Sequence, residues 1–224
     1  MKRGRLDVLL AILVVAVMSF HLLPPWLHEY LAIVLLVAVV YHVVRNRWWF
    51  GSLFRGRWTV ERGFSSLVTL VTIVGMVVVM VTGLFISSYA TPGWFGRDLQ
   101  RNMLVHLLHV SLPYVLLAIA GLHIGVHGSQ IVARVKSSFG AKTWLVGWPI
   151  RIVIGLLALV GIYGAWANRL VDRIQLKHIF ATEAMKLPEP VTVLLLVGIV
   201  ALFAWIGYAL AWLARAISSK TATK

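Results

Sequence analysis

The 224-residue chain contains no cysteine and few charged residues. Without cysteine it forms no disulfide, holds no iron–sulfur cluster and attaches no c-type haem covalently. Only 12% of its residues are charged, whereas about 25% are charged in a typical soluble domain. Acidic residues are the scarcest, with seven Asp and Glu against 21 Lys and Arg. This composition argues against an ordinary soluble enzyme and against any centre built on thiolates.

Hydrophobic residues are abundant instead, at 60% of the chain. An apolar run of roughly 17–25 residues with few charges is typical of a membrane-spanning helix. Six runs qualify, at 6–23, 28–44, 67–86, 103–126, 145–166 and 191–214. Only helices and closed barrels satisfy their backbone groups in lipid, so we expect an all-α polytopic membrane protein with six transmembrane helices. No small-x-small cleavage site follows the first run, and we expect that run to be retained as a helix.

The distribution of charge predicts an orientation. If the N-terminus is cytoplasmic, 15 of the 21 basic residues lie inside and five of the seven acidic residues lie outside. Loops rich in Lys and Arg stay on the cytoplasmic side, so both termini are expected there. This pattern explains the net charge of +14 without a nucleic-acid partner. We expect a multi-pass protein of a prokaryotic inner (cytoplasmic) membrane.

Histidines occur in two pairs with the same spacing, inside two of the apolar runs. His28 and His42 are 14 residues apart, and so are His109 and His123. Fourteen residues is nearly four helical turns, which places the members of a pair about 40° apart on one face and about 21 Å apart along the axis. Both helices are expected to run from outside to inside, so His28 faces His109 and His42 faces His123. Such facing pairs in a bundle core suit bis-histidine haem ligation.

Two other interpretations of the histidines stay open. Polar side chains in membrane helices can relay protons in a transporter, but the sequence shows no clear membrane-embedded carboxylate to accompany them. The chain could also be a structural or assembly subunit that keeps the bundle without electron traffic.

The segment HVSLPYVLLAIAGLHIGVHGS, which begins at His109, resembles the fourth helix of the respiratory and photosynthetic cytochrome b family. That helix has a haem histidine, a proline four residues on (here Pro113), a second haem histidine at 14, and then another histidine and Gly-Ser. The segment HVVRNRWWFGS, which begins at His42, resembles the end of the family's second helix. The resemblance implies a four-helix bundle over residues 1–142 with two non-covalent haem b groups, and a two-helix extension over 143–224. It also implies that Arg45 pairs with a haem propionate, which suits arginine–carboxylate geometry.

The HEY sequence at His28 and the HIGVH sequence at His123 are also similar to the small membrane cytochromes associated with flavinylated extracytoplasmic proteins. The likeness to cytochrome b weakens at its outer quinol site, where that family has Pro-Glu-Trp-Tyr and this chain has Pro188-Glu189-Pro190-Val191. The family's glycines beside the haems correspond to Gly75 and Gly83 in the third run, while the first run has only small alanines.

The remaining histidines carry weaker expectations. His127, one turn beyond His123, is a candidate quinone or proton-relay residue or a plain interfacial histidine. His21, His106 and His178 fall near the outer side, where a third haem or a docking site is a less favoured alternative.

The expected function is electron transfer across the membrane between an extracytoplasmic redox partner and quinone or the inner face, within a larger complex. The partner is expected to be a cytochrome c, a flavoprotein, or an iron–sulfur or dehydrogenase subunit. Two histidine ligands leave haem iron no open axial position, so oxygen binding is not expected.

Overall fold

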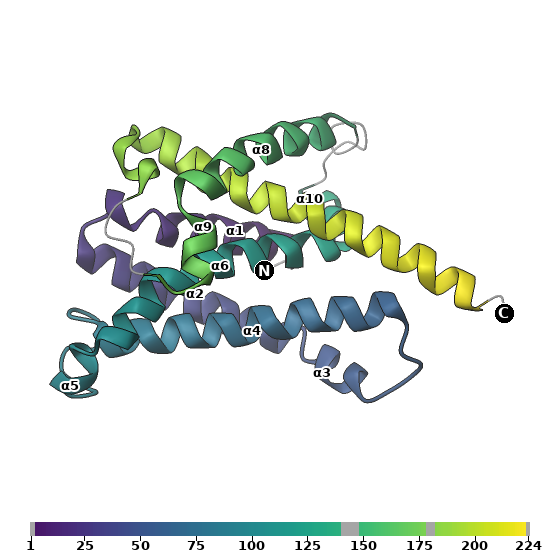
Figure 1. Ribbon diagram of the computed structural model, residues 1–224. Coiled ribbons are helices and arrows are strands. Elements are labelled where there is room, and N and C mark those ends of the chain that lie inside the picture. The colour runs from purple at the N-terminus through teal and green to yellow at the C-terminus, as the bar shows by residue number, and fades with distance from the viewer. Residues whose placement is uncertain (1–2, 140–147, 178–181, 223–224) are drawn as a thin grey trace.

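The computed structural model describes residues 3–139, 148–177 and 182–222, and in these ranges the chain is all-helical (Figure 1). Long helices alternate with short surface helices. The elements in chain order are α1 (Arg3–Met18), η1 (Phe20–Leu22), α2 (Pro25–Arg45), α3 (Trp48–Leu53), α4 (Val60–Ile86), α5 (Arg97–Gln100), α6 (Met103–Val126), α7 (Gly128–Phe139), α8 (Trp148–Ala167), α9 (Leu170–Ile174), η2 (Glu183–Lys186) and α10 (Glu189–Ala222). The boundary expected between residues 142 and 143 lies outside the described ranges.

Four helices are long and apolar enough to cross a membrane, namely α2, α4, α6 and α10. Of the six transmembrane helices expected from the sequence, four are supported by the described residues. The helix of the first run stops at Met18, and the run continues as η1 towards Pro24 and Pro25, which cannot donate to a continuing helix. The 16 residues of α1 rise about 24 Å, less than a bilayer core of about 30 Å. In α8 the described apolar stretch, Ile152–Ala167, is equally short, and the expected start of its run at 145 is not described.

The helix α6 occupies the middle of the molecule and packs against α4 on one side and α10 on another. Small residues permit the close approach of α6 to α10. A side chain at Gly125 would collide with the backbone of Ala204, and one at Gly161 would collide with the backbone of Gly198 where α8 meets α10. Such glycine contacts are typical of helices that associate within membranes, where van der Waals packing replaces the hydrophobic effect.

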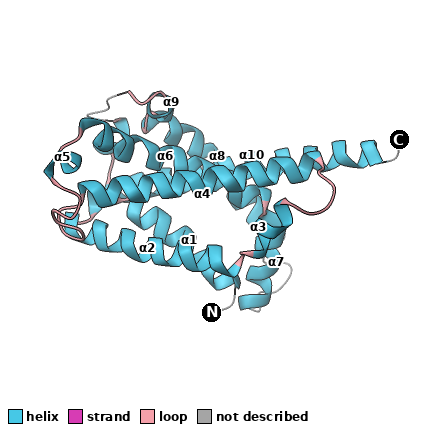
Figure 2. Ribbon diagram, turned by 90° about the horizontal axis from the view of Figure 1, so that it is seen from below, coloured by secondary structure: helices cyan, strands magenta, loops and turns pink. Residues whose placement is uncertain are grey.

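The helices α1 and α2 form a second layer on the α4–α6 pair (Figure 2). The helix α2 packs mainly on α1 and only sparsely on α4, and Leu35 is its one buried residue. The amphipathic helix α7 follows α6 directly and packs across α1. The side of α2 that faces α4 and α6 is therefore the loosest part of the helix packing, and the candidate site lies there.

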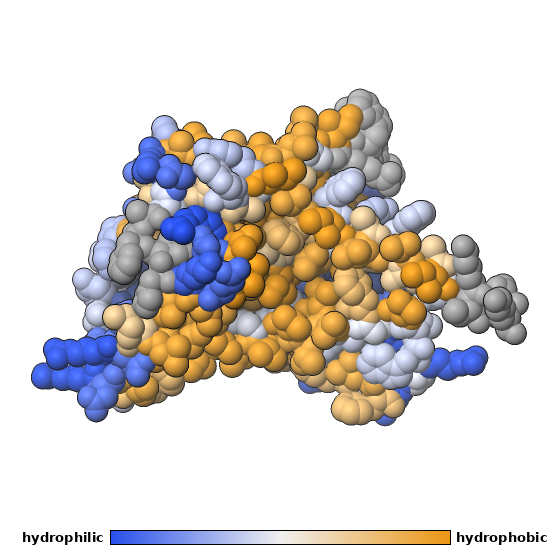
Figure 3. Space-filling model, viewed as in Figure 1, coloured by the Kyte–Doolittle hydropathy of each residue, from blue (hydrophilic) through white to orange (hydrophobic). Residues whose placement is uncertain are grey.

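The surface matches a lipid environment. Large apolar side chains such as Ile12, Val37 and Leu67 are more than half exposed on the long helices. Apolar residues cover the middle of the face in Figure 3, and hydrophilic residues gather towards its two ends. Exposed apolar patches this extensive indicate contact with a membrane.

Candidate functional site

The structure brings the first members of the two histidine pairs together. The rings of His28, on α2, and His109, on α6, have centroids 6.4 Å apart and planes 78° apart. We call this the His28 end of the bundle, and the opposite end, where α2 and α6 finish, the His42 end. In a bis-imidazole metal complex with metal–nitrogen bonds of about 2.0 Å, ring centroids lie roughly 6–6.5 Å apart. The centroids of this pair are therefore as far apart as those of two imidazoles that share one metal ion.

Both rings at the His28 end are held through the same nitrogen. The Nδ1 atom of His28 lies 3.1 Å from the carbonyl oxygen of Val17, on α1. The Nδ1 atom of His109 lies 3.2 Å from the carbonyl of Val79 and 3.4 Å from the hydroxyl of Thr82, both on α4. A carbonyl only accepts, so each Nδ1 carries the proton and donates. Each Nε2 then keeps its lone pair, which is the tautomer that ligates a metal.

The Nδ1 atoms of the other two histidines, at the His42 end, also face groups on α4 and α1. The Nδ1 atom of His123 lies 3.5 Å from the hydroxyl of Thr69, on α4, and that hydroxyl donates to the carbonyl of Ser65. The Nδ1 atom of His42 lies 3.6 Å from a carboxylate oxygen of Asp7, on α1. His42 and His123 are near enough to interact electrostatically. Thus α1 supports the histidines of α2, and α4 supports those of α6.

A cavity of about 190 Å³ lies between α2, α4 and α6 at the His28 end. Its lining includes both rings and the apolar side chains between them, from His28, Ala32, Leu36, Val79, Gly83 and His109. A Cβ atom at Gly83 would lie 2.7 Å from Cε1 of His109, which is closer than atoms can pack. Only glycine leaves room for the ring of His109 here, and its expected place beside a haem stays a prediction.

Glu29 fixes the His28 end of α2 to the end of α4. Its carboxylate accepts hydrogen bonds from the Ser87 hydroxyl at 2.7 Å and from three successive backbone N–H groups, those of residues 88, 89 and 90, at 2.8–3.0 Å. Nothing in its sequence context had indicated this role. Because Glu29 follows His28 directly, the same contacts set the position of that histidine.

One carboxylate is buried within the helix packing, although none was clear from the sequence. The side chain of Asp7 is only 9% exposed, and it lies between His42 and Arg134 of α7. The sequence could have signalled this residue, because it is the only acidic residue in its apolar run. The threonines could also have been predicted as partners of the histidines, because Thr69 and Thr82 are 13 residues apart, close to the histidine spacing of 14.

His127 and Arg45 lie at the His42 end with partners of their own. The Nε2 atom of His127 lies 3.2 Å from the hydroxyl of Thr69, and its ring stacks obliquely on that of His123 with centroids 4.7 Å apart. Arg45 donates to the hydroxyl of Tyr41 at 2.9 Å and lies over its ring. The propionate contact expected of Arg45 stays a prediction.

The remaining histidines do not form a third pair in the described part of the chain. His21 is exposed and contacts Phe20, which separates it from His28. His106 is exposed and lies 2.8 Å from the carbonyl of Gln100. His178 lies outside the described residues. The described ranges also contain no group of three or more His, Cys, Asp or Glu that could hold a metal ion, so pairs of histidines are the available ligand sets.

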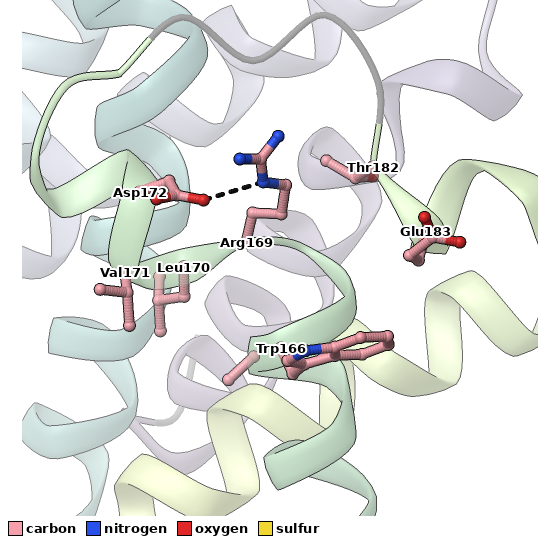
Figure 4. A pocket seen from close by; sticks show the side chains of 8 residues that line it. Trp166, Arg169, Leu170, Val171, Asp172, Thr182 and Glu183 are labelled. Atoms are coloured by element: carbon pink, nitrogen blue, oxygen red, sulfur yellow. Dashed lines mark hydrogen bonds and ion pairs between the residues drawn. The ribbon is translucent and has the colours of Figure 1, made fainter.

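A second cavity, of about 370 Å³, lies where α8, α9 and η2 meet (Figure 4). Arg169 and Asp172 close part of it by a 2.8 Å ion pair, and Trp166 forms another wall. Hydrogen bonds from Arg169 and Lys177 hold the pKa of the Asp172 carboxyl below its usual value. Arg169 and Asp172 are thus paired with each other, Glu183 pairs with Lys186, and none of the lining residues is a histidine.

No family model, curated protein or solved structure matches this chain.

Proposed function

We propose that the chain is a membrane-embedded b-type cytochrome that carries electrons along its helix bundle between two haem sites. His28 and His109 would hold one haem, and His42 and His123 would hold the other. The haem iron supplies one-electron redox chemistry, and the chain supplies position and electrostatic surroundings. The lack of cysteine means that both groups would be bound without covalent attachment.

One observation carries the proposal. The rings of His28 and His109 stand 6.4 Å apart while backbone carbonyls of neighbouring helices fix their Nδ1 atoms. Two histidines that merely filled polar positions in a membrane helix would have no reason to lie at the ring separation of a bis-imidazole metal complex with their Nδ1 atoms already bonded. At the second site, the Nδ1 atom of His123 faces the Thr69 hydroxyl, and that of His42 faces the Asp7 carboxylate at 3.6 Å, outside hydrogen-bond range.

The layout suits electron transfer along the bundle axis. The two histidines of α2 are about 21 Å apart along the helix, which spans most of a bilayer core of about 30 Å. Leu35 and Leu116 lie midway in the two histidine pairs, and both are buried. Buried apolar side chains therefore separate the two proposed haem sites at the midpoint of the bundle.

The proposal extends to the partners. Electrons would pass between an extracytoplasmic redox protein at the His28 end and quinone or the cytoplasmic face at the His42 end, in the inner membrane of a prokaryote. His127, which shares Thr69 with His123, is the residue best placed to contact a quinone there. Both termini would lie in the cytoplasm, in accordance with the charge distribution.

A reduced-minus-oxidised spectrum of the purified chain, with haem quantitation, tests the proposal. We expect low-spin b-type haem at two per chain, and one per chain after His28→Ala or after His42→Ala. His106→Ala is the matched control, because that exposed histidine bonds only to a local carbonyl, and it should keep both haems. A purified chain without low-spin haem would refute the assignment.

A proton-relay function is the second candidate, and the buried Asp7 carboxylate is the observation that favours it. Together with His42, and with the Thr69 hydroxyl linking His123 to His127, it gives the His42 end a set of groups that can exchange protons. That function predicts proton flux through proteoliposomes made from haem-free protein. A subunit with a purely structural role would instead bind haem without redox turnover in its intact complex.

A further inference from the structure

The four candidate ligand histidines differ in what faces their Nδ1 atoms. His28 and His109 face uncharged carbonyl oxygens, and His123 faces a hydroxyl. His42 alone among the four faces a carboxylate, that of Asp7. No carboxylate faces Nδ1 at the His28 end, where Glu29 lines the cavity beside the rings, whereas Asp7 faces Nδ1 of His42 directly.

Asp7 is held in place from its other side. One oxygen lies 3.6 Å from Nδ1 of His42, and the other lies 3.5 Å from Nη1 of Arg134. Arg134 belongs to α7, which packs across α1 directly after the end of α6. The carboxylate thus joins three elements, α1, α2 and α7, at the His42 end.

The contact is close to a hydrogen bond without being one. Oδ2 of Asp7 and Nδ1 of His42 are both buried, and neither has a hydrogen-bond partner among the described residues. A charged imidazole–carboxylate hydrogen bond is about 2.7–2.9 Å long, so a shift of less than about 1 Å would complete it. Burying a carboxylate costs several kcal/mol unless its partners repay the loss of hydration. A carboxylate in this position is therefore a candidate for a function beyond packing.

We infer that Asp7 is a positioning residue for His42 and gives the haem site at the His42 end a lower reduction potential than the site at the His28 end. The inference rests on the proposed haem function. A carboxylate that accepts from Nδ1–H increases the electron donation of Nε2, which stabilises the more positive, oxidised iron. Carbonyl and hydroxyl acceptors do this less, so the site of His109 keeps the higher potential. Arg134, on the other oxygen of Asp7, carries the opposite charge and offsets part of the effect.

The test is a redox titration of the full chain in nanodiscs, with Asp7→Asn as the variant. Asparagine has the same shape and keeps an acceptor oxygen while removing the charge. We expect the equilibrium constant for reducing one haem to rise about tenfold, which corresponds to ~59 mV for one electron. The other haem should be unaffected. Asp7→Glu, which keeps the charge, should restore most of the lower potential.

Three further variants separate this effect from general loosening of the structure. Asp7→Asn with Arg134→Gln removes both buried charges, so it should fold at least as well as the single variant and still show the raised potential. Thr82→Val should shift only the haem that Asp7→Asn leaves unchanged. Asp172→Asn, at the exposed ion pair of the second cavity, should shift neither.

The outcomes distinguish the inference from the function on which it rests. If the wild-type chain binds no haem, the proposed function fails. If it binds two haems and Asp7→Asn moves neither potential, or moves both equally, the function stands and the role of Asp7 is refuted. If the double variant returns to the wild-type potentials, the charge of Arg134 cancels that of Asp7 at the haem, and the inference is again wrong.

Discussion

Replacing Gly83 with alanine places a methyl group against the ring of His109. The added Cβ would lie 2.7 Å from Cε1 of that ring, whereas carbon atoms pack at about 3.5–4.0 Å. The ring must therefore retreat by about 1 Å, which is the difference between the two distances. A displacement of that size lengthens its 3.2 Å bond to the carbonyl of Val79 beyond hydrogen-bond range and changes its 6.4 Å separation from His28.

Two glycines of the same helix provide a graded comparison. A Cβ at Gly63 meets nothing within 4 Å, and one at Gly75 meets the tip of the Leu116 side chain at 3.1 Å. A leucine tip can rotate away, while the ring of His109 is fixed by its hydrogen bonds. We therefore expect Gly63→Ala to be neutral, Gly75→Ala to be mild, and Gly83→Ala to destabilise the fold by about 1–3 kcal/mol through overpacking.

Haem content and spin state are the decisive measurements for this series, with thermal unfolding as the companion readout. Gly83→Ala should lose the haem at the His28 end, or convert it to a high-spin form, while the haem at the His42 end stays low-spin. If Gly83→Ala keeps two low-spin haems with the same spectrum as Gly63→Ala, the ring of His109 is not held where the structure has it, and the reasoning fails.

Two further substitutions test the contacts that hold the helices of the candidate site in place. Glu29→Ala should destabilise the chain by about 1–3 kcal/mol, because it leaves three backbone N–H groups and the Ser87 hydroxyl without their acceptor. Thermal unfolding in detergent measures the loss, and an unchanged melting temperature would contradict it. Gly125→Val should separate α6 from α10 and lower the melting temperature, whereas Gly128→Ala, whose Cβ meets only a ring carbon at 3.8 Å, should not. Equal stability of those two variants would show that the glycine contact is dispensable.

Much of the helical framework follows from the sequence, because long apolar runs form helices wherever water is absent. The runs at 28–44, 67–86, 103–126 and 191–214 fall within α2, α4, α6 and α10. The first run illustrates the limit of hydropathy. Residues 19–23, Ser-Phe-His-Leu-Leu, still belong to the apolar run, yet the helix ends at Met18, because hydropathy does not register where the backbone turns towards two prolines.

The candidate site could likewise be predicted from the sequence only in part. Equal spacing along two helices predicts that paired histidines can share a face, and His28 and His109 do lie together. The partners of these histidines could not be predicted from spacing, since Val17 and Val79 act through backbone carbonyls that every residue possesses. Glu29 is similar, because its role depends on a loop 58–61 residues away in the chain.

The sequence by itself determined the surroundings of this protein and the histidines that we propose as ligands. Composition excludes thiolate chemistry, apolar runs require a membrane, and a doubled 14-residue spacing aligns four imidazoles in two layers. Only the tertiary structure decided which nitrogen of each ring is free, because that depends on the acceptor that a neighbouring helix presents. It also decided that Asp7 faces His42, which makes the two ends of the bundle electrostatically different. Periodicity along one helix fixes which residues share a face, whereas charge at a site depends on the contacts between helices.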